Sequence, residues 1–203
     1  MVLLTLAFTF LGLIFFAFDA CYIRTPVIGY SMRPTINKDV TSDKEQGDIV
    51  YINKFREVKV GDIVSADAGE LYEDYIIKRL VAKEGDKLKI INNENEFVLV
   101  CNDRELYTVK KSNNSKAYYA CFLELVDSYD PNLTGVDANG VEYIVIKQGE
   151  AFLMSDNWNE NVIDCVTQKT AVDINEIVGG VDIIFYKNES KLTLITKILK
   201  LIF

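Results

Sequence analysis

Two side chains in this sequence could together carry out hydrolytic chemistry. Ser31 lies in IGYSMRPTI (28–36), and Lys78 lies in YIIKRLVA (75–82). A serine hydroxyl is a poor nucleophile until a base removes its proton. The sequence contains no histidine, which excludes a Ser-His-Asp site, a Cys-His site and a histidine-liganded zinc. The base must therefore be an Asp, Glu, Lys, Tyr or Cys side chain.

A lysine can act as this base only if its surroundings keep it uncharged. An exposed lysine has a pKa of about 10.4, so desolvation must lower that value by several units. Lys78 has the most apolar context, because Ile76, Ile77, Leu80 and Val81 surround it. Side chains alternate along a strand, so Lys78 and Arg79 point to opposite faces and only one needs burial. Lysines in apolar strands more often extend to water, so this pattern alone is weak evidence.

The elements that must position these residues begin with an apolar segment, residues 1–23. No charged residue occurs through Phe18, and the run approaches the roughly 20 residues that cross a bilayer as a helix. A cleaved secretory signal has a basic start, a shorter apolar region and a small-residue exit, which this segment lacks. We therefore expect a retained, single-pass transmembrane anchor. No basic residue precedes it, so the positive-inside rule gives little help with orientation.

The rest of the chain predicts a mostly β fold. Short apolar or β-branched runs alternate with Gly, Asn and Asp turns, and a hairpin is expected to turn at Asn102-Asp103. The expected strand regions are 47–55, 61–66, 75–82, 87–93, 96–106, 142–157 and 176–188, with a polar loop at 110–119 and turn-rich chain at 128–142. Residues 191–203 have helical periodicity. They predict an amphipathic helix that either packs on the domain or lies on the membrane surface.

Composition sets further limits. The 203 residues suffice for one domain with an insertion or for two small domains. A net charge of −8 argues against nucleic acid as a partner. The four cysteines fit neither paired CxxC zinc sites nor a thioredoxin-like motif. Cys101 and Cys121 could pair outside the cell, although free thiols are the better-supported interpretation. No metal and no organic cofactor is implied.

The motifs, taken in order, resemble those of the bacterial type I signal peptidases, a Ser-Lys dyad serine protease family. SMRPT (31–35) resembles the nucleophile motif, and GDIVYINKF followed by GDIV resembles paired Gly-Asp strands. YIIKRLVAKEGD (75–86) resembles the block with the general-base lysine, and SDNWNENVIDC (155–165) resembles the Asp-Asn block. With the final strand, the resemblance covers nearly the whole chain.

The resemblance implies a membrane-bound serine endopeptidase that removes signal peptides from exported preproteins on the extracytoplasmic side of the cell membrane. Its partners would be preproteins and membrane lipid. Ser31 would form an acyl-enzyme, Lys78 would deprotonate Ser31 and then a water, and the Ser31 N–H would help to hold the oxyanion. Gly29 stands where some members place a second oxyanion donor, so this donor is absent. The implied substrate-binding residues are Val27, Gly29, Met32, Ile36, Ile76 and Ile77.

The resemblance also implies a domain organisation and supporting residues. An antiparallel β catalytic domain would comprise residues 24–91 and 146–190. A smaller inserted β domain would comprise residues 92–145 and interrupt the catalytic domain. The anchor would comprise residues 1–23, and the amphipathic helix residues 191–203. Arg79 and Asp156 would form a structural ion pair. Asn161 falls near the family's lysine-binding serine and would hydrogen-bond Lys78, and Asp164 occupies the final aspartate position.

Departures from the family pattern cluster at 155–166. The block is one residue longer, and Ser155, Trp158 and Val166 replace a glycine and two arginines. These changes leave open an alternative, a weakly active or inactive assembly factor or chaperone for pilin-like surface proteins. A self-cleaving repressor-type protease also uses Ser-Lys chemistry, but the anchor and the net charge disfavour it.

Overall fold

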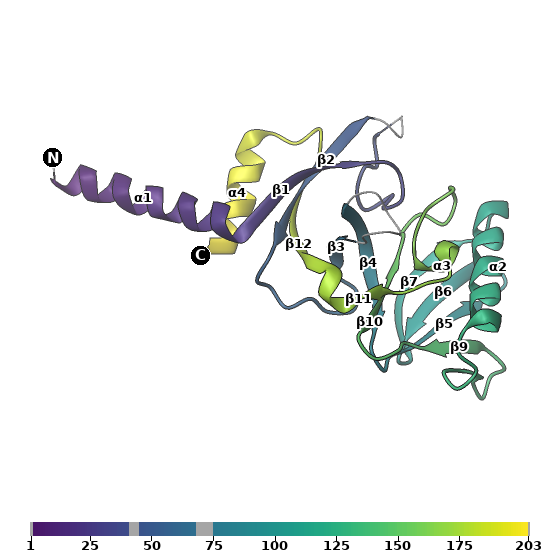
Figure 1. Cartoon of the computed structure of the whole chain (residues 1–203). Coiled ribbons are helices and arrows are strands. Elements are labelled where there is room, and N and C mark those ends of the chain that lie inside the picture. Colours follow the sequence, from purple (N-terminus) through teal and green to yellow (C-terminus); the bar gives the residue numbers. More distant parts are fainter. Residues whose placement is uncertain (1, 41–44, 68–74, 203) are drawn as a thin grey trace.

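The computed structural model describes residues 2–40, 45–67 and 75–202, with only the backbone at Val2, Leu3, Ala7 and Ile202. Parts of the predicted anchor, catalytic domain and C-terminal helix (residues 1, 41–44, 68–74 and 203) lie outside the described residues. Helix α1 (Val2–Cys21) projects away from a body of two sheets (Figure 1). It is long and apolar enough to cross a membrane, and none of its Leu4–Cys21 window is buried.

The first sheet is antiparallel and contains seven strands in the order β1-β2-β12-β3-β4-β10-β11. Strand β1 continues directly from α1 and forms one edge of this sheet. The seven strands are β1 (Tyr22–Ile28), β2 (Gln46–Asn53), β3 (Ile63–Asp67), β4 (Tyr75–Lys83), β10 (Glu150–Met154), β11 (Val172–Asp173) and β12 (Ile177–Phe185).

The second sheet contains five strands in the order β7-β6-β5-β9-β8. Its β6–β7 hairpin turns at Asn102 and Asp103, both with positive φ, as predicted. The members are β5 (Lys87–Asn92), β6 (Glu96–Cys101), β7 (Arg104–Lys110), β8 (Thr134–Val136) and β9 (Glu142–Val145). The mostly β class with two antiparallel sheets and an apolar N-terminal helix is therefore confirmed.

The change from the first sheet to the second comes earlier than the predicted boundary at residue 92. It falls between β4 and β5, where the chain turns at Gly85. This residue has a φ of +78°, a backbone conformation that glycine adopts without steric cost. The predicted strand region 142–157 is likewise two strands, because β9 belongs to the second sheet and β10 to the first. The division of the chain into a catalytic and an inserted domain stays a prediction.

The predicted polar loop at 110–119 is wrong, because helix α2 (Asn113–Ser128) begins there. Ser112 caps the helix, and Ser112 and Ser115 form a reciprocal capping box. Asparagine and serine in the first turn have weak helix propensity and concealed the helix. Its buried face nevertheless has helical spacing: Ser115, Tyr118, Phe122, Leu125 and Val126.

A single apolar core joins the two sheets and α2. It includes Leu80 and Phe152 from the first sheet, Leu88 and Leu99 from the second, and Phe122 from α2. A smaller cluster lies between β1, β2 and the loop that follows β1, and consists of Val27, Met32, Ile36, Val50 and Ile52.

Two short helices and the C-terminal helix complete the fold. Helix α3 (Cys165–Gln168) and the 3-10 turn η2 (Ile174–Glu176) precede β12. Helix α4 (Lys191–Ile202) confirms the predicted C-terminal helix. All four cysteines are free thiols, so Cys101 and Cys121 are unpaired.

Candidate active site

Ser31 lies in a tight loop directly after β1. Gly29 has a φ of +87°, a conformation that glycine adopts without steric cost, and it turns the chain away from the strand. The Arg33 N–H donates to Tyr30 O, and the Ile36 N–H donates to Met32 O. These turns present the half-buried Ser31 at the start of the loop.

Asn37 fastens this loop to the sheet. Its side-chain amide donates to the carbonyls of Val27 (3.1 Å) and Gly29 (2.9 Å), and its Oδ1 accepts the Asp48 N–H at 2.7 Å. The adjacent Gly47 is required by this arrangement, because a Cβ there would overlap the Asn37 side chain. The first Gly-Asp pair of the sequence thus supports the serine loop.

Lys78 extends from β4 toward this loop. Its Nζ lies 2.8 Å from Ser31 Oγ and 3.3 Å from Ile77 O. Only 6% of the residue is exposed. Two residues 47 positions apart in the chain are therefore in direct hydrogen-bond contact.

Burial and nearby charges act in opposite directions on the protonation of Lys78. Burial lowers the pKa of the Lys78 amine below its ordinary value, while the charges of Asp164 and Asp156 act in the opposite direction. Burial dominates, and it also raises the pKa of the neighbouring Cys165 thiol to about 12. The thiol is therefore neutral near pH 7 and contributes no charge to the site.

Arg79 points to the other side of β4, as strand alternation predicts. Its Nε and Nη2 donate to the two oxygens of Asp156 at 2.7 and 2.5 Å, a bidentate ion pair. Its Nη1 donates to Gly61 O, in the second Gly-Asp pair, and Thr35 Oγ1 donates to Asp156. This network connects β4, the loop after β10 and the serine loop.

A cleft of about 570 Å³ opens beside the Ser31–Lys78 pair, between β1 and the start of β4. Of the predicted substrate-binding residues, Val27, Ile76 and Ile77 line it. Five further lining residues were missed in the sequence analysis: Thr25, Pro26, Ile28, Ser65 and Tyr75. The missed residues of β1 and β4 lie within two positions of Val27 or Ile76, whereas nothing in the sequence marked Ser65 of β3.

The other predicted substrate-binding residues lie elsewhere. Met32 and Ile36 do not line the cleft; they are buried in the small apolar cluster beneath the serine loop. Gly29 is likewise not a lining residue, and its role is the turn described above. These positions support the loop that carries Ser31.

Asn161 does not take the predicted position next to Lys78. Its side chain is exposed, and it lines a separate pocket against α2 together with Asn114 and Tyr118. Within the described residues, the hydrogen-bond acceptors of Lys78 Nζ are Ser31 and Ile77. The loop contacts α2 instead, where the Asn114 side-chain amide donates to Asn159 O.

Asp164 is fully buried and is stabilised by a residue that the sequence analysis missed. Tyr118 Oη donates to it at 2.7 Å, and the backbone N–H groups of Ser155, Val166 and Thr167 also donate to it. The last two belong to α3, which Asp164 caps. Tyr118 escaped notice because it lies in the helix that we expected to be a loop.

The loop after β10 also holds the serine loop directly. The Asn157 N–H donates to Ser31 O at 3.0 Å, and its side-chain amide donates to Tyr30 O at 3.1 Å. Trp158 is buried, stacks on Tyr118 at 4.7 Å and donates to Ser155 O. The 155–166 block therefore contacts the serine loop through Asn157 and the neighbour of Lys78, Arg79, through Asp156.

This arrangement contains a hydroxyl, a desolvated amine that can accept its proton and an adjacent cleft. Such a set can perform nucleophilic attack on an acyl carbon. Within residues 2–40, 45–67 and 75–202, no group of three or more Cys, Asp or Glu side chains could hold a metal ion.

Comparison with known proteins gives two kinds of match. Residues 1–186 match the family model described as "Signal peptidase, peptidase S26". The chain is also similar to mitochondrial inner membrane protease subunit 2 from Mus musculus (38% identity over 85 residues) and from Danio rerio (36% identity over 78 residues). These alignments include 40% and 36% of this chain and span 46% and 41% of the two relatives, which is less than half of each.

Proposed function

The chain belongs to the signal peptidase S26 family, and we propose that it is a membrane-bound serine endopeptidase that cleaves N-terminal signal peptides from exported preproteins. The observation that carries this proposal is the 2.8 Å contact between the Lys78 amine and the Ser31 hydroxyl. Burial of the amine lowers its pKa, which would allow it to act as a base without histidine. The same Ser-Lys chemistry is expected of the bacterial type I signal peptidases that the sequence resembles.

In the first half of the reaction, neutral Lys78 would accept the Ser31 proton while Ser31 Oγ attacks the scissile carbonyl. The Ser31 N–H would donate to the oxyanion of the tetrahedral intermediate. The intermediate would then collapse as the Lys78 ammonium protonates the leaving amine. The mature protein would depart, and the signal peptide would remain as an ester on Ser31.

In the second half, Lys78 is neutral again and would deprotonate a water that attacks the ester. Collapse of the second intermediate would return the proton from Lys78 to Ser31 Oγ. The signal peptide would leave with a new carboxylate. One lysine thus serves as base and acid in both halves, as microscopic reversibility allows.

The shape of the cleft suits an extended peptide with small side chains near the cut. Strand β1 is an edge strand, so an extended peptide could be added beside it. Val27, Ile76 and Ile77 form apolar walls beside Ser31. Shallow walls of this kind would favour alanine at the positions one and three residues before the cut.

The anchor would keep this cleft near the bilayer. Thr25, which lines the cleft, is four residues beyond the end of α1 at Cys21. Four residues of strand span about 13 Å. If the body lies on the extracytoplasmic side, the cleavage site of a membrane-inserted preprotein would emerge beside Ser31, which raises the effective concentration of both.

The test is cleavage of a preprotein by the full chain in liposomes. We expect Ser31→Ala to remove measurable cleavage, and Lys78→Met to reduce kcat/KM by roughly 10²- to 10⁴-fold, as loss of a general base does. Lys83→Met, at the end of the same strand, is the matched control and should keep activity. Full activity in either Ser31→Ala or Lys78→Met would overturn the mechanism.

A second candidate is an assembly factor or chaperone for pilin-like surface proteins, which the departures at 155–166 favour. The exposed side chain of Asn161 is the specific observation, because it leaves Lys78 without the expected second side-chain partner among the described residues. Assembly of surface fibres that is unchanged in both dyad variants would support this candidate instead.

A further inference from the structure

The C-terminal helix α4 has an apolar face that the described parts of the chain leave exposed. Leu192, Ile195 and Leu199 are 72%, 52% and 48% exposed. At 100° per residue they fall within an arc of about 60° on one side of the helix. A row of three large exposed apolar side chains on one helix face is unusual for a surface in water.

This face points away from the body of the protein. Lys197 lies almost opposite to it on the helix, and its ammonium donates to Ile184 O in β12 and to the Glu189 carboxylate. Leu194 and Ile198, on the adjoining side, are partly covered. The helix is thus attached to the body by one side and leaves its other apolar side outward.

The C-terminal end of α4 lies against α1. Leu201 encloses a small cavity together with Ile14, Ala17 and Phe18 of α1. Ile14 is seven residues from the end of α1 at Cys21, which is about 10 Å along a helix. A membrane spanned by α1 must therefore reach the level of α4.

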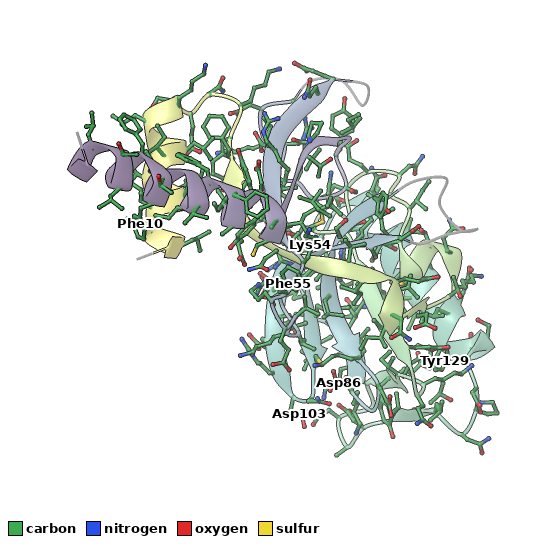
Figure 2. All side chains as sticks on the ribbon, turned by 60° about the vertical axis from the view of Figure 1, so that its left-hand side comes forward. Phe10, Lys54, Phe55, Asp86, Asp103 and Tyr129 are labelled. Carbon is green, nitrogen blue, oxygen red and sulfur yellow. The ribbon has the colours of Figure 1, made fainter. Side chains whose placement is uncertain are left out.

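The direction of α4 suits the plane of such a membrane. Both views show α4 running across the axis of α1, on the side where α1 leaves the body (Figure 1 and Figure 2). Its 12 residues extend only about 18 Å, too short for the roughly 30 Å hydrocarbon core. A short helix crosswise to a spanning helix lies along the bilayer surface.

Charge and neighbouring residues favour lipid as the partner of this face. Helix α4 carries Lys191, Lys197 and Lys200 and no acidic residue, although the whole chain has a net charge of −8. Near the end of α1, the Lys54 N–H donates to Cys21 O, and the adjacent Phe55 is 76% exposed (Figure 2). A basic helix flanked by exposed apolar side chains matches an anionic phospholipid surface.

We propose that α4 is an in-plane membrane helix. Leu192, Ile195 and Leu199 insert among the acyl chains of the bilayer that α1 spans, and Lys191 and Lys200 contact anionic headgroups. With α1, this second attachment fixes the rotation of the body about the anchor and therefore the height of the cleft above the lipid.

Tryptophan fluorescence in the full chain tests this without any measurement of proteolysis. The chain has one tryptophan, Trp158, which is buried in the body, so its signal can be subtracted. We compare Ile195→Trp with Thr196→Trp in vesicles of phosphatidylcholine and phosphatidylglycerol. The side chain at position 196 lies about 100° around the helix from that at position 195. Quenching by bromine-labelled acyl chains should be at least about twofold stronger for Ile195→Trp, and quenching by aqueous iodide correspondingly weaker.

Three outcomes would overturn the proposal. Equal quenching of the two variants by brominated lipid would place the apolar face outside the bilayer. If the difference in quenching between the two variants disappears when the protein is diluted within the bilayer, the face is an interface between copies of the chain. The third outcome is quenching that is the same in pure phosphatidylcholine and that does not change in the double variant Lys191→Gln with Lys200→Gln. This result would exclude contact of the two lysines with anionic headgroups.

Discussion

At the scale of single residues, the protonation of Lys78 is decided by a competition between burial and two nearby carboxylates. Asp164 and Asp156 both raise the pKa of Lys78, yet the net shift is downward. Each carboxylate already has its own donors: Tyr118 and backbone N–H groups for Asp164, and Arg79 and Thr35 for Asp156. Burial of the amine is the larger effect, so desolvation prevails over both charges.

The pH dependence of cleavage follows from this shift. Only neutral Lys78 can accept the Ser31 proton, so kcat/KM should rise with pH through the pKa of Lys78 in the free enzyme. Because burial lowers that pKa, the rise should be complete well below the value of about 10.4 that an exposed lysine has. The measurement is kcat/KM for a peptide substrate from pH 5 to pH 10. A profile without this acidic limb, in an enzyme limited by chemistry, would exclude Lys78 as the base.

The same shift predicts how Lys78 affects stability. Between its lowered folded-state pKa and about 10.4, the unfolded chain binds more protons at this lysine, so the free energy of unfolding rises with pH. Lys78 is therefore most destabilising at low pH and no longer so above about pH 10.4. We expect Lys78→Met to raise the melting temperature near pH 7, with a gain that shrinks toward pH 10. A gain that is constant with pH, or that grows, would contradict this.

At the scale of elements, α2 and α3 explain how the 155–166 block tolerates its departures. Val166 removes the arginine that the family pattern places near the final aspartate. Asp164 instead caps α3 and accepts a hydrogen bond from Tyr118 of α2. Burial and the charge of Asp164 raise the pKa of Tyr118 well above its ordinary value, so this phenol remains a donor at neutral pH. Helix α2 thus supplies a neutral hydrogen-bond donor to a buried carboxylate near the site.

Tyr118→Phe tests this replacement. Removing the hydroxyl leaves one lone pair of a buried carboxylate unsatisfied, which should lower the free energy of unfolding by about 1–3 kcal/mol. We also expect a lower kcat/KM, because Asp164 orders the block that holds the Ser31 carbonyl. The measurements are urea unfolding and peptide cleavage.

Tyr129→Phe is the matched control for that variant. The Tyr129 hydroxyl donates to Glu150 at 3.3 Å in a partly exposed position, so its loss should be smaller, under about 1 kcal/mol. Equal losses in the two variants would show that Tyr118 has no particular role at Asp164.

At the scale of the whole molecule, the two sheets share one core. Trp158 is 1% exposed and lies at their junction. It belongs to the loop that follows β10 of the first sheet, and its ring contacts Tyr107 of β7 and Tyr118 of α2. The core cluster likewise contains residues of both sheets. We therefore expect the two sheets to unfold together.

Trp158→Ala should test this coupling. Truncation of a buried tryptophan typically lowers the free energy of unfolding by about 3–5 kcal/mol. Hydrogen exchange should then accelerate in both sheets by similar factors, whereas Phe55→Ala, at an exposed position, should change neither. Faster exchange confined to the second sheet would show that the sheets unfold independently.

The sequence by itself determined the local features of this protein. An uninterrupted apolar run predicts α1, alternating and β-branched runs predict most strands, and Asn102-Asp103 predicts a hairpin turn, because each depends only on near neighbours in the chain. The absence of histidine and the apolar context of Lys78 likewise identified a candidate base before any coordinates.

Only the tertiary structure decided which distant groups meet. Helix α2 was missed because its stability comes from packing its buried face on the second sheet, not from the propensity of its polar first turn. The Tyr118–Asp164 contact, the exposure of Asn161 and the burial of Met32 and Ile36 beneath the serine loop depend on how the two sheets and a lengthened loop are placed in space. Burial and hydrogen bonding are properties of that placement, and no spacing along the chain specifies them.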